Sequence, residues 1–562
     1  MTYSTASRIN QETDRHYESL REVTISTFNT EAGQVESSIS VPNQRRFKGR
    51  KPVIPSSLSD TPCRVLGVVG LLAMLNTILN TSYTLHTAWI YSLLGAFIVK
   101  DSDLGTAYAY LRRFWYRRDF TDVEDELRTR EERDLMMRED VLVNTRIISE
   151  MVPPRRVWDL YSNRVVPWWA ARGWPYAISH AWVEEKDRMD MWTPINGYEW
   201  PVPIPKDSNL DLIRIEMLNA GAEYAWLDVL CLRQEDGRRE DLRAEEWKLD
   251  VPTIGFVYKG FEPIVYYFNG LGRPLHIKAG DFESDRNWFK RVWTLQEFAH
   301  DKRIIGGDTG DDTAMAEGVR AEFDRRLLAL QEISDVPGMS TALSHIRDRV
   351  CTNPVDRIAG LVYLLVWVDA IPAYYEMQSM EDAWTALVDV LSGRDRAALF
   401  FTYPRPGNRN KVWRPSWSQV MNNVEVLPSN IEAWVERTED TDSDWVEEVS
   451  IESGYVQGFA EGSHDGKRRH GELIVTDNAG TRHTFKIIAD HQYQISDGLY
   501  ALLGSRQYNF FDHQVLDQYW VVGRRLPERK FEKVSVFQIA DNEEMKRLDK
   551  LEIATKAKFF LA

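Results

Sequence analysis

The sequence predicts an α/β protein: a mainly parallel sheet with flanking helical segments, followed by a mostly β module at the C-terminal end. Three observations predict this class. Between about residues 174 and 307, short apolar runs rich in strand formers alternate with helix-forming segments. Helical periodicity dominates the residues before and after this stretch. From about residue 452 onward, apolar and polar residues alternate between turns, which is typical of antiparallel strands.

The composition is that of a globular protein, and 562 residues at about 150 per domain indicate three or four folding units. Residues 1–60 are rich in Ser, Thr, Gln and Asn and poor in aromatics, so we expect a disordered leader there. The other expected segments are a helical N-terminal region (61–150), an α/β domain (151–310), a helical region packing on that domain (311–420) and the mostly β C-terminal module (421–562).

Charge and cysteine content exclude several classes of function. The formal net charge of −16 disfavours binding to nucleic acid or to anionic lipid. Cys63, Cys231 and Cys351 lie far apart and form no CxxC pair, which excludes a disulfide framework and a zinc knuckle. The first residues have no apolar core of a secretory signal. We therefore expect a cytoplasmic protein with reduced thiols and no nucleic-acid partner.

The stretch between Arg64 and Lys100 carries no charge, which raises the question of a membrane segment. Each of its two apolar runs is shorter than the roughly 20 residues that a span requires. The polar turn NTSYT (80–84) separates them and would be costly in hydrocarbon. This pattern favours two buried helices joined by a turn over the alternative, contact with a membrane.

The sequence of the α/β domain predicts four strands that alternate with helices. The expected strands are 174–182, 222–234, 262–268 and 302–307, and the expected helices are 210–221, 239–260 and 287–300. Asp207, Ser208 and Asn209 supply an N-cap for the first helix, and Gly221 ends it. Pro252 disturbs the second helix. In a parallel sheet with this alternation, ligands gather at the carboxyl ends of the strands.

Candidate functional residues follow from polar side chains at these strand ends. Ser179 and His180 end the first expected strand, and Trp182 lies just beyond it. Asp228 interrupts the second strand, and Gln234 closes it. A carboxylate inside a buried run is costly unless it is paired or hydrogen-bonded. Asp228 therefore either accepts backbone N–H bonds and anchors a loop, or lies at the mouth of a ligand cleft.

The expected helix 287–300 carries a second group of candidates. Trp293 and Glu297 are four residues apart and would share a helix face, with Gln296 adjacent. An aromatic plane beside a carboxylate suits a flat cationic heterocycle. In the alternative interpretation, Trp293 is a core residue and Glu297 pairs with Arg291 or another base. The common catalytic signatures, including the nucleophile elbow, the Walker A loop and HExxH, are absent from the sequence.

Three segments in this order resemble the motifs of the fungal heterokaryon-incompatibility (HET) domain: SHAW, WLDVLCLRQ and RVWTLQE. Downstream, NPVDRIAGLVYLL and WRPSWSQ resemble segments that follow this domain in many members. The resemblance is specific over residues 174–300 and looser to about 420. The HET family is similar to Toll/interleukin-receptor (TIR) domains, so the resemblance implies a flavodoxin-like fold. It also implies an effector in fungal nonself recognition that triggers cell death.

Several TIR relatives cleave NAD, so the resemblance implies NAD as a substrate, with no bound cofactor or metal. Cleavage of the nicotinamide–ribose bond needs a carboxylate near the developing oxocarbenium ion and an aromatic surface beside the nicotinamide. In this interpretation the catalytic residues are Glu297 and Asp228, and the substrate-binding residues are Trp293 (the stacking face), Gln296, Ser179, Trp182 and Gln234.

The chain departs from the family pattern at two places. Val183 and Glu184 stand where members have a Gly soon after the first motif, and Arg233 replaces an acidic residue before the Gln of the second. TIR-type enzymes generally act when assembled, so self-association is an expected interaction. The alternative function is a non-catalytic interaction module that signals through self-association or through an unidentified protein partner.

Overall fold

The protein is described by a computed structural model that covers two compact units. The described residues are 16–26, 38–50, 52–87, 89–117, 119–171, 173–299, 301–311, 315–335, 339–365, 370–409, 411–422, 431–462, 468–509, 514–539 and 541–562. The first unit comprises Met1–Asp335, Arg349–Tyr363 and Ala373–Glu376, and the second comprises Val336–Asp348, Leu364–Pro372 and Met377–Ala562. The helical region expected at 311–420 is thus divided between the two units.

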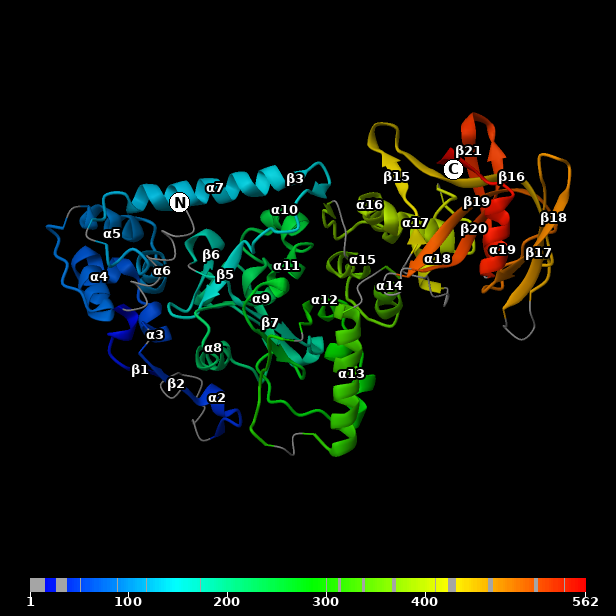
Figure 1. The fold of residues 1–562 in the computed structure, drawn as a ribbon. Helices are drawn as coiled ribbons and strands as arrows, with labels where there is room; N and C mark the ends of the chain where they lie inside the picture. The colour runs from blue at the N-terminus through cyan, green and yellow to red at the C-terminus, as the bar shows by residue number, and fades with distance from the viewer. Residues whose placement is uncertain are drawn as a thin grey trace. The chain divides into compact units, whose positions relative to one another are not determined.

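The described part of the first unit is built around a six-stranded sheet (Figure 1). In spatial order its strands are β12 (Arg303–Ile305), β11 (Ile264–Tyr267), β7 (Tyr176–His180), β10 (Tyr224–Trp226), β5 (Arg156–Asp159) and β6 (Arg164–Pro167). The pairs β12–β11, β11–β7 and β7–β10 are parallel, whereas β10–β5 and β5–β6 are antiparallel. The expectation of an α/β protein is confirmed, and this sheet contains pairs of both kinds.

Helices connect the parallel strands. They are α8 (Leu210–Asn219), α9 (Asp228–Cys231), α10 (Glu240–Asp250), α11 (Ile254–Lys259) and α12 (Thr294–Glu297). The Asn209 side chain accepts the Asp211 N–H at the start of α8, as its N-cap position predicts. Gly221, at φ 95°, lies directly after this helix. The helical pattern breaks between α10 and α11, where Pro252 lies.

Two of the expected elements in this region are wrong. The strand expected at 222–234 is only three residues long, and Asp228 begins the short helix α9 instead of interrupting a strand. The helix expected at 287–300 is a 3₁₀ turn, Trp288–Lys290 (η7), an extended Arg291, and the single turn of α12. Trp293 precedes α12, so Trp293 and Glu297 do not share the face of a continuous helix.

Part of the expected disordered leader is ordered. Strand β1 (Val23–Ser26) pairs with β2 (Arg46–Gly49), and α2 (Pro42–Arg45) lies next to β2. Gln44 is buried and donates a 2.7 Å hydrogen bond to Glu216 of α8. Residues 1–15, 27–37 and 51 lie outside the described residues.

The expected helical region after residue 60 contains α4 (Cys63–Leu79), α5 (Ile90–Val99), α6 (Leu104–Leu111) and α7 (Val123–Val141), preceded by α3 (Ser56–Ser59). Helices α4 and α5 are only partly buried: Leu75 and Leu94 are inaccessible, whereas Val69 and Val99 are exposed. Within the described part of the chain, no helix has both the length and the apolar composition needed to cross a bilayer.

The remaining elements of the first unit are short, apart from one long helix. They are β3 (Leu142–Val143), β4 (Arg146–Ile147), β8 (Arg188–Met191), β9 (Val202–Pro205), α13 (Glu317–Asp335) and α15 (Asp356–Ala359). Strands β8 and β9 form an antiparallel pair between β7 and α8 in the chain. A crossover therefore leads from β7 to its parallel neighbour β10.

The second unit contains the large antiparallel sheet expected at the C-terminal end. Its helices are α14 (Met339–Arg347), α16 (Met380–Val390), α17 (Gly393–Thr402), α18 (Trp417–Asn422) and α19 (Asn542–Lys550). Its strands are β13 (Ile371–Pro372), β14 (Ile431–Glu432), β15 (Val435–Thr438), β16 (Ser443–Gln457), β17 (Arg469–Thr476), β18 (Arg482–Ala489), β19 (Gly498–Asn509), β20 (Gln514–Leu526), β21 (Lys530–Ile539) and β22 (Thr555–Leu561).

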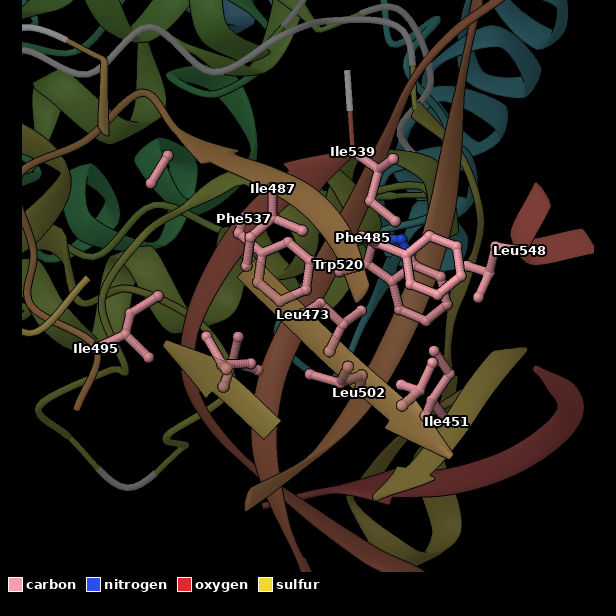
Figure 2. Close-up of a cluster of buried hydrophobic side chains, with 14 of the residues drawn as sticks. Ile451, Leu473, Phe485, Ile487, Ile495, Leu502, Trp520, Phe537, Ile539 and Leu548 are labelled. Carbon is pink, nitrogen blue, oxygen red and sulfur yellow. The ribbon is translucent and has the colours of Figure 1, made fainter. Parts of the chain in front are cut away.

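Antiparallel pairings in this sheet close into a ring, β16–β19–β20–β21–β18–β17–β16. Apolar side chains from these strands form a buried cluster, in which Trp520, Phe485 and Phe537 are almost inaccessible (Figure 2). Leu548 of α19 belongs to the same cluster. Asp477 to Gly480 lie in the turn that joins β17 to β18.

Candidate functional site

The candidate site lies where two neighbouring parallel strands of the first unit end. Strand β7 ends with Ser179 and His180, and Asp228 begins α9 soon after the end of β10. Because β7 and β10 pair in parallel, their carboxyl ends lie at the same edge of the sheet. Glu297, at the end of α12, reaches Ser179 at this edge. The structure thus brings together residues from all three of the motifs.

Ser179 joins two parts of the chain that are more than a hundred residues apart. Its hydroxyl donates a 2.5 Å hydrogen bond to Glu297 Oε2 and accepts one of 2.8 Å from Trp288 Nε1. Tyr266, on the neighbouring strand β11, donates to the Glu297 backbone carbonyl at 2.9 Å. All four residues are buried. The Glu297 carboxyl group therefore accepts from one neutral donor, the Ser179 hydroxyl, which Trp288 orients in turn.

Burial raises the pKa of Glu297 to about 7. The bond from Ser179 and the charge of His180 lower this pKa, and the charge of Asp228 raises it. The expected alternative, an ion pair between Glu297 and Arg291 or another base, does not form among the described residues. A carboxyl group in this state is present in both protonation forms at neutral pH.

His180 and Asp228 form the second pair of the site. His180 Nε2 lies 2.9 Å from Asp228 Oδ1, and Asp228 also accepts the Val229 N–H at 2.7 Å and a hydrogen bond from Trp182. The rings of His180 and Trp182 stack with their centroids 5.9 Å apart. Asp228 therefore anchors the start of α9 and also pairs with a residue of the first motif.

Burial and charge shift the two pKa values of this pair in opposite senses. Burial lowers the pKa of His180, but the adjacent Asp228 carboxylate outweighs burial and raises it. Burial raises the pKa of Asp228, but His180 and the N–H donors outweigh burial and lower it. Glu297 further raises the pKa of His180, so the His180–Asp228 and Ser179–Glu297 pairs act on each other electrostatically.

The two glutamines expected in the site differ in their surroundings. Gln234 donates to the Leu232 carbonyl at 2.9 Å and to the Asp228 carbonyl at 3.4 Å, so it closes the turn after α9. Gln296 is 6 % exposed, and neither its amide nitrogen nor its amide oxygen has a hydrogen-bond partner among the described residues. Burying an unpaired amide costs about 1–3 kcal/mol.

The Trp293 side chain is hydrogen-bonded to a carboxyl group that is not part of the candidate site. It donates a hydrogen bond to Asp356 of α15, which also accepts the Tyr374 hydroxyl at 2.8 Å. Burial raises the pKa of Asp356 to about 6, and these two donors lower it. The indole of Trp293 thus links η7 and α12 to α15. Trp182, which contacts both His180 and Asp228, is an aromatic ring in direct contact with the candidate site.

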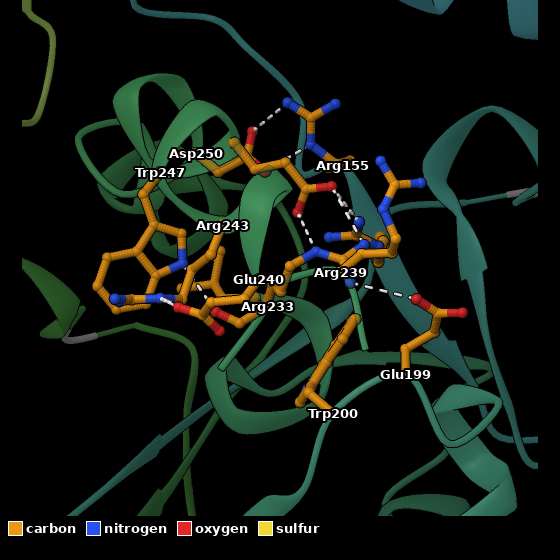
Figure 3. A network of polar contacts seen from close by, with 12 residues as sticks. Arg155, Glu199, Trp200, Arg233, Arg239, Glu240, Arg243, Trp247 and Asp250 are labelled. Atoms are coloured by element: carbon orange, nitrogen blue, oxygen red, sulfur yellow. Dashed lines mark hydrogen bonds and ion pairs between the residues drawn. The ribbon is translucent and has the colours of Figure 1, made fainter. Parts of the chain in front are cut away.

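Arg233, the residue that departs from the second motif, lies in a network of polar contacts (Figure 3). It is buried and forms ion pairs with Glu246 at 3.4 Å and Glu199 at 3.2 Å. Its guanidinium group lies 5.1 Å from the ring centroid of Trp200, and that of Arg156 lies 5.2 Å from it. Arg233 therefore ties the turn after α9 to α10 instead of supplying a carboxylate to the site.

Comparisons of the chain with models of known protein families, with curated proteins and with solved structures found no match. Within the described ranges, no group of three or more His, Cys, Asp and Glu side chains is arranged to hold a metal ion. The described side chains of the site offer three features. They are a buried carboxyl group whose pKa is raised to about 7, a hydrogen-bonded His–Asp pair and an aromatic ring beside that pair.

The sequence pattern missed two members of the site. Trp288 lies in the segment read as one amphipathic helix, where a tryptophan is an ordinary core residue. Its hydrogen bond to Ser179 depends on the fold of residues far apart in the chain. His180 stands with Ser179 among the strand-end candidates, but the sequence interpretation gives it no catalytic or binding role.

Proposed function

We propose that this chain is a HET-domain protein that acts in the cytoplasm as an effector of fungal nonself recognition and cell death. In this proposal the first unit cleaves NAD. One observation carries the proposal: segments of all three motifs contribute to one group of bonded side chains, through Ser179–Glu297 and His180–Asp228. Residues that form a common reaction site must meet in this way, although they are far apart in the chain.

The topology of the sheet supports a flavodoxin-like and TIR-like fold. Numbered along the chain, the four parallel strands have the spatial order 2-1-3-4. Doubly wound flavodoxin-like sheets use this order, and they bind ligands at the carboxyl ends of the strands where the winding direction reverses. Here that reversal falls between β7 and β11, and the last residues of β7 are Ser179 and His180.

The proposed reaction breaks the bond between the nicotinamide nitrogen and C1′ of the ribose. The bonding electron pair leaves with nicotinamide, and an oxocarbenium ion develops on the ribose until water adds at C1′ and loses a proton. The ionised form of Glu297 stabilises this cation, and Ser179 and Trp288 hold the carboxylate in place. Trp182, in place of Trp293, supplies the aromatic surface, because Trp182 contacts His180 and Asp228 of the site, whereas Trp293 is bonded to Asp356 instead.

The test measures nicotinamide release from NAD by the purified full-length chain. We expect Glu297→Gln to reduce release by at least about a hundredfold, because the developing cation loses its carboxylate. The matched control is Glu317→Gln, which changes an exposed glutamate of α13 and should leave release unchanged. Each protein is also assayed after fusion to a dimerisation domain. No release in either form, or equal release by the chain and Glu297→Gln, would refute the catalytic assignment.

A non-catalytic interaction module is the second candidate function. The burial of Glu297 and its bonds to the neighbouring side chains favour it, because the same contacts stabilise a fold without any substrate. Cell killing on expression in yeast separates the candidates. If folded Glu297→Gln and Asp228→Asn variants kill as the parent chain does, signalling depends on self-association or on a protein partner.

A further inference from the structure

Arg188, the first residue of β8, lies over the ring of Trp182, the aromatic residue of the candidate site. Its guanidinium carbon Cζ is 5.5 Å from the ring centroid. Both residues are half-buried, so part of each remains accessible to solvent. A guanidinium group is a planar cation that is attracted to the face of an indole. The nicotinamide ring of NAD is also a planar cation, so the two groups suit the same surface.

The other neighbours of Trp182 hold its indole in place. The ring stacks with that of His180 at a centroid distance of 5.9 Å, and the indole donates a hydrogen bond to Asp228. His180 is buried and lies 2.9 Å from Asp228 Oδ1 through Nε2. These two residues are therefore fixed neighbours of the indole, because either could leave it only by breaking the bond between them.

Arg188, by contrast, is held through its backbone. Strand β8 pairs with β9, with Arg188 opposite Pro205, and the Lys206 N–H donates to the Asp187 carbonyl at 2.9 Å. The guanidinium group forms no ion pair and no hydrogen bond with any residue that the structure describes. A cation–π contact at an accessible site is weak. The side chain can therefore change rotamer while the strand stays paired.

We propose that the face of Trp182 covered by Arg188 binds the nicotinamide ring, and that Arg188 leaves this face when the substrate arrives. The inference rests on the function proposed above, which supplies the identity of the ligand. His180 and Asp228 stay bonded to each other, so the half-buried arginine is the neighbour that gives way. Each binding event then includes the loss of the contact between Arg188 and Trp182. Removal of the guanidinium group should therefore strengthen the binding of a flat ring.

The test is titration of the full-length chain with nicotinamide and with 1-methylnicotinamide, followed through the NMR signals of these ligands. Nicotinamide is neutral, 1-methylnicotinamide is a pyridinium cation, and neither contains the bond that the proposed reaction breaks. We expect Arg188→Ala to bind both about two- to fivefold more tightly than the parent chain, which corresponds to the loss of one accessible cation–π contact. Arg188→Lys should give a smaller gain, because an ammonium group is also drawn to the ring.

The matched control is Arg286→Ala, which removes the same charge from an arginine that pairs with Glu184 at 3.4 Å. It should change the binding of either ligand less than about twofold. The two ligands separate displacement from charge repulsion. Tighter binding of 1-methylnicotinamide alone would overturn the proposal, because a guanidinium group that covers the ring must hinder a neutral ring as well.

Equal or weaker binding of nicotinamide by a folded Arg188→Ala variant would also overturn the proposal. Absence of binding of either ligand to the parent chain and to Arg188→Ala would do the same. Should Arg188→Ala fail to fold, as judged by circular dichroism, equal or weaker binding by Arg188→Lys is the contradicting result.

This proposal and the proposed NAD cleavage fail in different ways. If Arg188→Ala gains affinity for both rings but neither it nor the parent chain releases nicotinamide from NAD, the ring site stands and the cleavage falls. If NAD is cleaved with the same KM by the parent chain and by Arg188→Ala, the cleavage stands and the displacement of Arg188 falls.

Discussion

At the scale of single residues, Glu297 shows how the fold sets the state of a side chain. It is buried, its strongest contacts are neutral donors, and burial raises its pKa to about 7. The unfolded chain would hold this group as an ordinary glutamate with a pKa near 4.3. The folded protein therefore binds a proton on Glu297 that the unfolded chain releases between these two pH values.

This difference predicts how Glu297→Gln changes the pH dependence of stability. Through Glu297, the free energy of unfolding of the parent chain should fall as pH rises from about 4.5 to about 7, by on the order of 3 kcal/mol. The variant has no such carboxyl group, so this part of the fall should disappear. Urea unfolding of both proteins at about pH 5 and about pH 8 measures it.

Both proteins keep the remaining titrating pair of the site, so the difference between them reports Glu297 together with its effect on the pKa of His180. The raised pKa of His180 also favours the folded state at low pH, and the lowered pKa of Asp228 favours it at higher pH. Glu317→Gln again serves as the control, because its glutamate is exposed. If the free energy of unfolding of Glu297→Gln changes with pH as much as that of the parent chain, the raised pKa of Glu297 is contradicted.

The sequence identifies Ser179, Asp228 and Glu297 because strand ends and the family motifs single them out, and the structure brings these three together. It does not identify Trp288 as a partner of Ser179, because a tryptophan in an amphipathic segment is an ordinary core residue. It also assigns Trp293 to the site, whereas its indole is bonded to Asp356. Hydrogen-bond partners that are distant in the chain have no local signature.

At the scale of elements, the alternation of strands and helices predicts the parallel part of the sheet, since each short apolar run bounded by turns becomes a strand. The segment 287–300 has the apolar spacing of a helix, yet Arg291 is extended. The reason is a tertiary contact, because the backbone of residues 290–292 bonds to Val350. Such pairing overrides local propensity and cannot be read from the segment itself.

In the second unit, helix α19 contributes to the core enclosed by the ring of strands. Leu548 is 1 % exposed in the cluster that contains Trp520 and Phe537. We expect Leu548→Ala to lower the free energy of unfolding of this unit by about 2–5 kcal/mol, through lost burial and the cavity that remains. Hydrogen exchange of backbone amides in β20 and β21, followed by mass spectrometry, measures this local stability.

Leu499→Ala is the matched control for this substitution. Leu499 lies on β19 of the same unit and is 69 % exposed, so its truncation should change amide protection little. Equal loss of protection in the two variants would show that α19 does not stabilise the core described by these contacts.

At the scale of the whole molecule, the sequence predicts the type of secondary structure in each region better than the residues at which the region begins and ends. The mixed α/β part and the large antiparallel sheet at the C-terminal end agree with the sequence patterns. The compact units divide the residues between 311 and 420, because some of these segments belong to the first unit and others to the second. The described parts of the expected leader are ordered because they pair and pack with residues of the first unit, including Glu216.

The central claim is that the site around Glu297 acts by consuming NAD, and the most direct measurement is the NAD content of yeast cells that express the full-length chain. We predict that NAD falls before the cells lose viability and stays at its normal level in cells with equal amounts of the Glu297→Gln protein. Cell death at an unchanged NAD content, or the same loss of NAD with both proteins, would contradict the account.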